Sequence, residues 1–390
     1  MNLGEVFYRH MLREPGAEAV IDGEIRRDYA AWYEEICAVA GGLQARGLKA
    51  GDHFVTVLSN RVETTTLYWA CQMLGLVFTP FNWRANVEEI AYVLDDADTV
   101  AVAFEAATRA STGEAIARHD DVALVSLDID AGDFELLLKS SPIEGPSAVD
   151  DSELCLMLYT SGTTGEPKGV LYSHRALALH ALGIALPDGF SLSERDTILP
   201  AVPMFHANAW GLPHAAAMTG AKLVLPGPRP SSQRIARLIS SEGVTFAAGV
   251  PTVWMGVLEE LRASGHSVSD ELRIHSGGAP SAPSLIEGYR TELGVEIVTG
   301  WGMTEISPVG MATHPRAHMK DWSDDRLLGV RTSQGTPLPF LEARIVDDAG
   351  EVCAHDGKVP GELEVRGPWV TAGYFRREAE EAFHDGWLRT

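Results

Sequence analysis

The chain alternates between short apolar runs and longer segments whose apolar residues recur every three to four positions. The short runs have the length of buried strands, and the longer segments have the period of amphipathic helices. We expect strands at 53–58, 77–80, 99–104, 122–127, 154–159, 222–225, 244–247, 272–275 and 296–299. We expect helices at 29–48, 62–75, 87–96, 173–186, 231–242, 252–263 and 281–293.

This order of elements predicts an α/β fold with layered sheets. Strands that are separated by helices imply crossover connections and sheets with helices on both faces. A polar, proline-containing connector at 140–151 interrupts the pattern. After about residue 328 the helices become sparse, and strands at 340–346 and 361–365 are expected around a turn. We therefore expect three segments, with chain exchange between the first two: an α/β segment 1–150, a second α/β segment 151–328, and a smaller, β-rich, barrel-like segment 329–390.

Composition narrows the class of protein. The chain has 390 residues and a net charge of −23, so it can bury a substantial core but lacks the basic surface that nucleic-acid binding requires. A local site for a phosphate-bearing ligand remains compatible with this charge. The four cysteines form no CxxC pair, which favours buried free thiols in a cytoplasmic protein: Cys37, Cys71, Cys155 and Cys353.

Two features bear on targeting and membranes. The first residues, MNLGE, lack the basic and apolar regions of a secretory signal. Residues 197–221 contain no Asp, Glu, Lys or Arg, but prolines, histidines and an asparagine interrupt them. A membrane span needs a longer regular apolar helix, so this stretch is expected to be buried core or pocket lining.

The strongest local motif is the sequence LYTSGTTGEPKG at 158–169. An apolar strand leads into hydroxyl residues and glycines, which supply donors and let backbone amides approach an anion, and into the positive Lys168. This composition suits nucleotide phosphates, and a flexible surface loop is the alternative. The motif is not a P-loop, because Pro167 and Gly169 stand where Gly and Ser or Thr are required.

The string YTSGTTGEPKG resembles the phosphate-loop signature of the adenylate-forming superfamily, which includes acyl- and aryl-CoA synthetases, firefly luciferase and adenylation domains of nonribosomal peptide synthetases. Further motifs follow in the expected order: PFNWR at 80–84, PMFHANAW at 203–210, SGGAP at 276–280, GWGMTE at 300–305 and GELEVRGP at 361–368. The residues of these motifs are most similar to those of medium- and long-chain fatty-acyl-CoA synthetases.

The resemblance implies that a carboxylate attacks the α-phosphate of ATP and that coenzyme A captures the acyl-adenylate as a thioester. The carboxylate is already ionised, so the site must position anions and neutralise charge but needs no general base. The resemblance further implies Mg²⁺, held by Thr160 and Glu305. It assigns ATP binding to Thr160, Ser161, Gly162, Thr163, Thr164, Gly165, Lys168, Gly277, Gly278, Ala279, Pro280, Gly300, Trp301, Gly302, Met303 and Thr304.

Catalytic roles are implied for Lys168, His206, Thr304 and Glu305. Trp301 is expected to stack on adenine, and Trp210 matches the position of an indole that gates the acyl tunnel of a related synthetase. Plainer alternatives are a structural histidine at 206, a helix cap at 304–305 and core packing of Trp210. The substrate-binding residues implied by the resemblance are His206, Ala207, Trp210, Gly211, Val250 and Met303.

The chain ends with GWLRT at 386–390. The resemblance implies that a longer enzyme continues with an aspartate for the ribose, a hinge and a C-terminal domain, so we expect residues 1–390 alone to be poorly active. The main alternative is a CoA ligase for an aryl or other small acid, and a second alternative is a non-catalytic nucleotide- or acyl-binding module. The expected partners are the fatty acid, ATP and coenzyme A, and the resemblance also suggests a homodimer.

Overall fold

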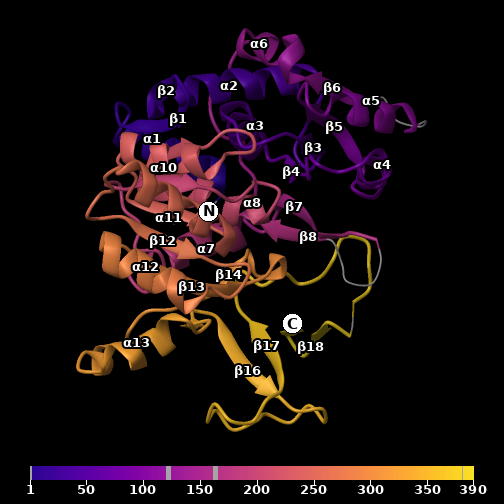
Figure 1. Cartoon of the computed structure of the whole chain (residues 1–390). Coiled ribbons are helices and arrows are strands. Elements are labelled where there is room, and N and C mark those ends of the chain that lie inside the picture. Colours follow the sequence, from indigo (N-terminus) through magenta and orange to yellow (C-terminus); the bar gives the residue numbers. More distant parts are fainter. Residues whose placement is uncertain (1, 120–123, 161–165, 380) are drawn as a thin grey trace.

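The computed structural model describes residues 2–119, 124–160, 166–379 and 381–390, and its strands form three sheets (Figure 1). The strands are β1 (Glu18–Asp22), β2 (Ile25–Asp28), β3 (His53–Val57), β4 (Val77–Pro80), β5 (Thr99–Phe104), β6 (Val125–Asp128), β7 (Leu154–Thr160), β8 (Lys168–Ser173), β9 (Thr197–Pro200), β10 (Lys222–Leu225), β11 (Phe246–Gly249), β12 (Arg273–Ser276), β13 (Glu296–Gly302), β14 (Val309–Ala312), β15 (Thr336–Pro337), β16 (Glu342–Val346), β17 (Glu362–Arg366), β18 (Phe383–His384) and β19 (Trp387–Arg389).

Thirteen α-helices connect and cover the sheets in the described part of the chain. They are α1 (Leu3–Arg13), α2 (Tyr29–Ala45), α3 (Val62–Leu74), α4 (Val87–Asp96), α5 (Arg109–Ala117), α6 (Asp133–Leu138), α7 (His174–Ala185), α8 (Ala207–Trp210), α9 (Leu212–Thr219), α10 (Ser232–Ser241), α11 (Pro251–Ser264), α12 (Pro283–Leu293) and α13 (Asp324–Arg331). Short 3₁₀ turns lie at η1 (Ile129–Ala131), η2 (Thr304–Ile306) and η3 (Ala317–Met319).

The two large sheets confirm the α/β expectation. A six-stranded sheet has the order β6-β5-β3-β4-β7-β8 and is parallel except for the β7–β8 hairpin. A nine-stranded sheet has the order β15-β14-β13-β12-β11-β9-β10-β1-β2 and is parallel from β13 to β1. Every residue of β3, β4, β9 and β11 is buried, as expected for strands that are covered on both faces.

Segments are exchanged between these sheets. β1 and β2 complete the nine-stranded sheet, which is otherwise built from residues after 196, while β7 and β8 complete the six-stranded sheet of the N-terminal part. The division at residue 150 therefore follows the order of the chain and not membership of the sheets, and it remains a proposal.

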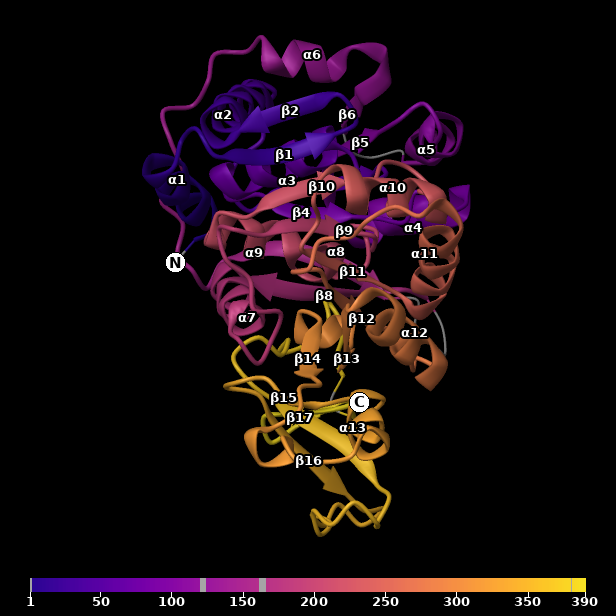
Figure 2. The same cartoon turned by 60° about the vertical axis from the view of Figure 1, so that its left-hand side comes forward.

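The third sheet is antiparallel and small. It has the order β16-β17-β19-β18, and it extends from the lower end of the molecule in both views (Figures 1 and 2). α13 lies at the same end and was not expected from the sequence.

The uncharged stretch 197–221 forms β9, α8 and α9 and is largely buried. None of the helices in the described residues is long and apolar enough for a membrane span. Cys37, Cys71 and Cys155 are buried free thiols, as expected. Cys353 is only partly buried, because it lies in the exposed loop between β16 and β17 of the small sheet.

Candidate active site

The hydroxyl- and glycine-rich segment is the turn of the β7–β8 hairpin. The register pairs Thr160, the last residue of β7, with Lys168, the first residue of β8. The described ends of the turn therefore fix where it leaves and re-enters the sheet. Outside the described residues lie five of the predicted phosphate-binding residues: Ser161, Gly162, Thr163, Thr164 and Gly165.

A side-chain network attaches both ends of this turn to α4. The Tyr159 hydroxyl donates to the Asp96 carboxylate (2.7 Å), and the Tyr92 hydroxyl donates to the Pro167 carbonyl (3.0 Å). The Arg377 guanidinium lies 3.6 Å from the same Asp96 carboxylate and also contacts the Tyr92 hydroxyl. Burial, reinforced by Asp96, raises the pKa of Tyr159, so its phenol stays protonated and able to donate.

Glu305 lies in η2, the turn between β13 and β14, and its side chain is only 7% exposed. Its carboxylate accepts a 2.7 Å hydrogen bond from the Tyr374 hydroxyl. The Lys168 ammonium lies 5.0 Å from the ring centroid of the same Tyr374. On the neighbouring residue, the Thr304 carbonyl accepts a 2.6 Å hydrogen bond from the Tyr172 hydroxyl of β8. The strand that follows the predicted phosphate turn and the predicted metal ligand are thus joined by two tyrosines.

Residues 371–375 complete this junction, and the sequence reasoning did not identify them. The Thr371 amide donates to the Glu305 carbonyl and the Phe375 amide donates to the Gly169 carbonyl, each at 2.8 Å. Tyr374 also forms an isolated antiparallel bridge with Val170 of β8. An aromatic pair directly after Gly373, in an otherwise polar stretch, was the available sequence signal.

A pocket of about 750 Å³ lies beside this junction. It gathers most of the predicted substrate- and adenine-side residues and adds apolar ones from α10 and α11, Ile235 and Val253. The pocket therefore joins a polar, glycine-lined part to an apolar part. The predicted residues that line it are His206, Ala207, Trp210, Val250, Gly277, Gly278, Gly300, Trp301, Gly302, Met303 and Thr304.

Three predicted site residues lie elsewhere. Ala279 and Pro280 are exposed and do not line this pocket. Gly211 faces the core, because a Cβ atom there would lie 2.9 Å from the His180 ring and 3.1 Å from His214 Nε2. A glycine is required at this position because the backbone has φ +80° and because the two rings leave no room for a side chain.

The wall that carries Trp210 is a left-handed turn. Ala207, Asn208, Ala209 and Trp210 have φ between 47° and 56°, in a region that costs L-residues roughly 1–2 kcal/mol each. This turn brings Trp210 against the glycine loop, where a Cβ on Gly277 would lie 3.3 Å from the indole. Trp210 consequently lines the pocket directly beside Gly277 and Gly278.

Positive side chains lie at the mouth of the pocket. Arg84 and Arg229 stack on the Trp83 ring at 4.3 and 4.8 Å, and both line the pocket. Neither forms an ion pair with any residue that the structure describes. Removal from bulk water and the nearby Arg84 lower the pKa of His206, so its ring is neutral at pH 7. A neutral His206 fits positioning of a substrate better than charge neutralisation.

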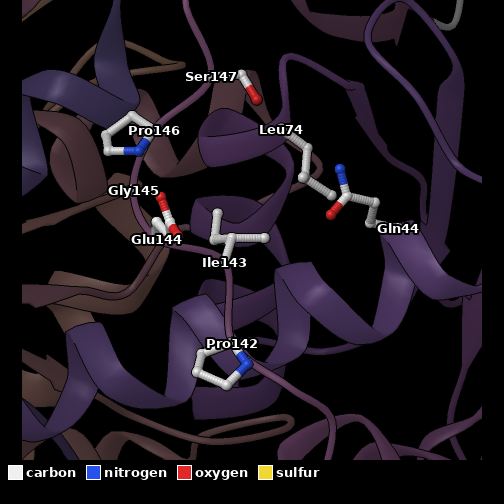
Figure 3. Close-up of a pocket in the computed structure, with 8 residues that line it drawn as sticks. All are labelled: Gln44, Leu74, Pro142, Ile143, Glu144, Gly145, Pro146 and Ser147. Atoms are coloured by element: carbon white, nitrogen blue, oxygen red, sulfur yellow. The ribbon is translucent and has the colours of Figure 1, made fainter.

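A second hollow, of about 620 Å³, lies along the connector 142–147 where it passes Gln44 and Leu74 (Figure 3). Its lining contains none of the predicted site residues. It is an open surface feature that the connector forms, separate from the candidate site.

This chain is similar to known proteins over most of its length, both in sequence and in structure. Residues 7–375 match the family described as AMP-binding enzyme. The chain is 39% identical to a long-chain-fatty-acid–CoA ligase of Thermus thermophilus over 379 residues, covering 94% of this chain and 69% of that protein. It is 38% identical to a medium-chain-fatty-acid–CoA ligase of Ectopseudomonas oleovorans, covering 98% and 73% of the two chains.

A third relative is a 3-methylmercaptopropionyl-CoA ligase of Ruegeria lacuscaerulensis, which is 35% identical, with 98% of this chain and 74% of that protein covered. Among solved structures, the N-terminal domain of FACL13 from Mycobacterium tuberculosis superposes with a TM-score of 0.88 at 26% identity, covering 100% of this chain and 95% of that one.

Proposed function

The chain belongs to the AMP-binding enzyme family, and on this basis we propose that it activates a medium- to long-chain fatty acid with ATP and transfers the acyl group to coenzyme A. As an AMP-forming acid–thiol ligase it would release AMP, pyrophosphate and the acyl-CoA thioester. The observation that carries the proposal is the single pocket that joins a glycine-lined polar part, with Trp301, to apolar side chains such as Val250 and Ile235.

The chemistry has two steps. A carboxylate oxygen of the acid bonds to the α-phosphorus of ATP, the bond from this phosphorus to the bridging oxygen breaks, and pyrophosphate leaves. The sulfur of coenzyme A, having lost its proton to solvent, then bonds to the acyl carbonyl carbon, and AMP leaves. Both steps require positioning and charge neutralisation. In this proposal Lys168 neutralises phosphate charge and Thr304 hydrogen-bonds the α-phosphate.

Mg²⁺ fits the donor set around Glu305. No group of three or more His, Cys, Asp or Glu side chains in the described ranges could form a complete metal cage. Mg²⁺ bound to a nucleotide needs only one or two protein oxygens, because phosphates and waters supply the others. Glu305, with the Thr160 hydroxyl as second oxygen, would hold the ion, and the ion would neutralise charge on the phosphates.

We assign adenine to the polar part of the pocket and the acyl chain to the apolar part. Trp301 and the backbone of Gly277 and Gly278 would receive adenine, since an indole face and glycine backbone permit stacking and close approach. Val250 and Val253 would line the acyl chain. His206 would orient the carboxylate.

A substrate panel tests the fatty-acid assignment. AMP release by the full-length protein should be measured with fatty acids from C4 to C16 and with benzoates, at saturating ATP and coenzyme A. We expect kcat/KM to rise with chain length into the medium or long range. An optimum at benzoate or at the shortest acids would favour a ligase for aryl or small acids, the class to which the 3-methylmercaptopropionyl-CoA ligase belongs.

A binding measurement tests the non-catalytic alternative. Calorimetric titration with ATP and Mg²⁺ should show saturable binding, and adding a carboxylic acid should yield pyrophosphate. Binding without pyrophosphate release in the full-length protein, with Lys168 and Glu305 intact, would favour a binding module.

A further inference from the structure

Tyr374 occupies a central position between two residues of the proposed ATP site. Its hydroxyl donates to one Glu305 oxygen, Oε1, at 2.7 Å. Its ring faces the Lys168 ammonium at 5.0 Å from the ring centroid, a distance at which the π face attracts a cation. One side chain therefore contacts both the proposed metal ligand and the proposed phosphate cation.

The surroundings keep Tyr374 in this place. Its backbone bridges Val170, and the next residue, Phe375, donates its amide to the Gly169 carbonyl at 2.8 Å. Its ring packs edge-on against Phe383, with centroids 5.7 Å apart. The half-buried ring thus has contacts on several sides, so its hydroxyl is held in a defined position.

The hydrogen bond uses one oxygen of the carboxylate and leaves the other available. Within the ranges 2–119, 124–160, 166–379 and 381–390, no donor lies within hydrogen-bond distance of Glu305 Oε2. A tyrosine phenol is protonated at neutral pH, so the Tyr374 hydroxyl acts as a donor to this carboxylate. Carboxylates that ligate metals are commonly oriented by such outer hydrogen bonds.

We propose that Tyr374 is a positioning residue that orients the Glu305 carboxylate for a Mg²⁺-bound polyphosphate and keeps Lys168 on the same side of the site. This inference rests on the proposed function, in which Glu305 binds Mg²⁺. Tyr172 has a different task, because its hydroxyl holds the backbone carbonyl of Thr304 and not a carboxylate.

The test uses Tyr374→Phe, which removes the hydroxyl and keeps the ring. Calorimetry gives the ATP dissociation constant across a series of Mg²⁺ concentrations, and electron paramagnetic resonance gives Mn²⁺ binding in the presence of ATP. We expect the metal concentration for half-maximal effect to rise about tenfold to a hundredfold. ATP affinity without metal and affinity for the carboxylic acid should stay within about twofold, since those contacts are unchanged.

Tyr289→Phe is the matched control. Tyr289 of α12 is fully buried, and its hydroxyl donates to the backbone carbonyl of Trp254 in α11 at 2.9 Å, outside the proposed site. This control should lower the thermal midpoint and leave the Mg²⁺ dependence unchanged. Should Tyr374→Phe lower the midpoint by the same amount and also leave the Mg²⁺ dependence unchanged, the positioning role is overturned.

A double-mutant cycle with Glu305→Gln separates the two levels of the proposal. When the carboxylate is absent, adding Tyr374→Phe should change metal binding no further, because both variants remove one coupled interaction. Independent, additive losses would contradict the inference. If the ATP affinity of the wild-type protein did not depend on Mg²⁺, the proposed function of Glu305 would be overturned, whatever the variants show.

Discussion

Acid should destabilise this protein steeply, because several histidines are buried in their neutral form. Burial lowers the pKa of His214 and His275 to about 3 and that of His174 to about 4. All three side chains are at most 3% exposed. In the unfolded chain a histidine titrates near pH 6.5. Below that pH the unfolded state binds protons that the folded state does not, so stability present above pH 6.5 is lost as the pH falls toward 3 to 4.

The magnitude follows from these shifts. Each histidine that is protonated only on unfolding contributes about 1.4 kcal/mol per pH unit. Between pH 6.5 and pH 5 the loss is about 2 kcal/mol for each ring, or about 6 kcal/mol for His174, His214 and His275 together. Typical net stabilities are about 5–15 kcal/mol, so a large share of the margin should disappear in this window.

Urea unfolding measured at half-unit steps from pH 7.5 to pH 5 provides the assay. The three rings should lower the free energy of unfolding by about 4 kcal/mol per pH unit near pH 5.5. His180, whose pKa burial lowers as well, should add to this slope. His275→Phe, which keeps an aromatic ring beside Phe190, should reduce this slope by about 1.4 kcal/mol per unit. The exposed His355, replaced by Gln, is the matched control and should leave the slope unchanged. A wild-type slope below about 1.4 kcal/mol per unit would refute the reasoning, because it would mean that fewer than one proton is taken up on unfolding.

Three further predictions concern the site. Trp210→Ala should shift acyl preference toward longer or bulkier acids, by a factor of about four for each additional methylene that becomes buried in the pocket. Calorimetry should show an unchanged affinity for Mg²⁺–ATP. Equal losses of affinity for both ligands would contradict a role in acyl selection. Gly302→Ala should destabilise by about 1–3 kcal/mol in urea unfolding, because its Cβ would lie 2.1 Å from the Pro308 carbonyl oxygen. Gly329→Ala, where nothing lies within 4 Å, should be neutral or stabilising. Asp96→Asn should raise the KM for ATP and leave the KM for the acid unchanged, because Asp96 holds one end of the β7–β8 turn. A raised KM for the acid with an unchanged KM for ATP would exclude this role of Asp96.

Elements with strong local signals were predicted at their observed bounds. β4, α4, β5 and β10 begin and end where the pattern places them. α4 has a local reason, since Asn86 and Glu89 form a capping box that fixes its start. α1 was missed although its signal was present, with Asn2 accepting from the Glu5 amide at the N-terminus of the helix.

Other elements depend on partners that are distant in sequence. β1 pairs with β10, and Val20 lies opposite Leu223, so neither the sheet nor its register follows from the local pattern. β11 is displaced by two residues from its expected position, to Phe246–Gly249. The strand is defined by its pairing with β9 and β12, which begins at Phe246 and not at the start of the apolar run at residue 244.

The site shows the same division between local and distant information. Two separate sequence motifs identified Lys168 and Glu305 as candidate site residues. Their shared contact with Tyr374 arises only when residues 371–375 dock between β8 and η2. A segment about two hundred residues from β8 cannot be placed there by composition or periodicity.

Gly211 illustrates how a structural requirement resembles a substrate contact. Four left-handed residues precede it, and at roughly 1–2 kcal/mol each they cost about 4–8 kcal/mol, a sum similar to a whole domain's net stability. Such a turn persists only where its surroundings determine it fully. Gly211 continues the left-handed path at φ +80°, and the rings of His180 and His214 leave no room for a Cβ atom at this position. The residue is therefore fixed by the wall behind the pocket. Two of the buried histidines that make the fold acid-sensitive lie in this wall, since His214 lies beside Gly211 and His275 packs edge-on against Trp210.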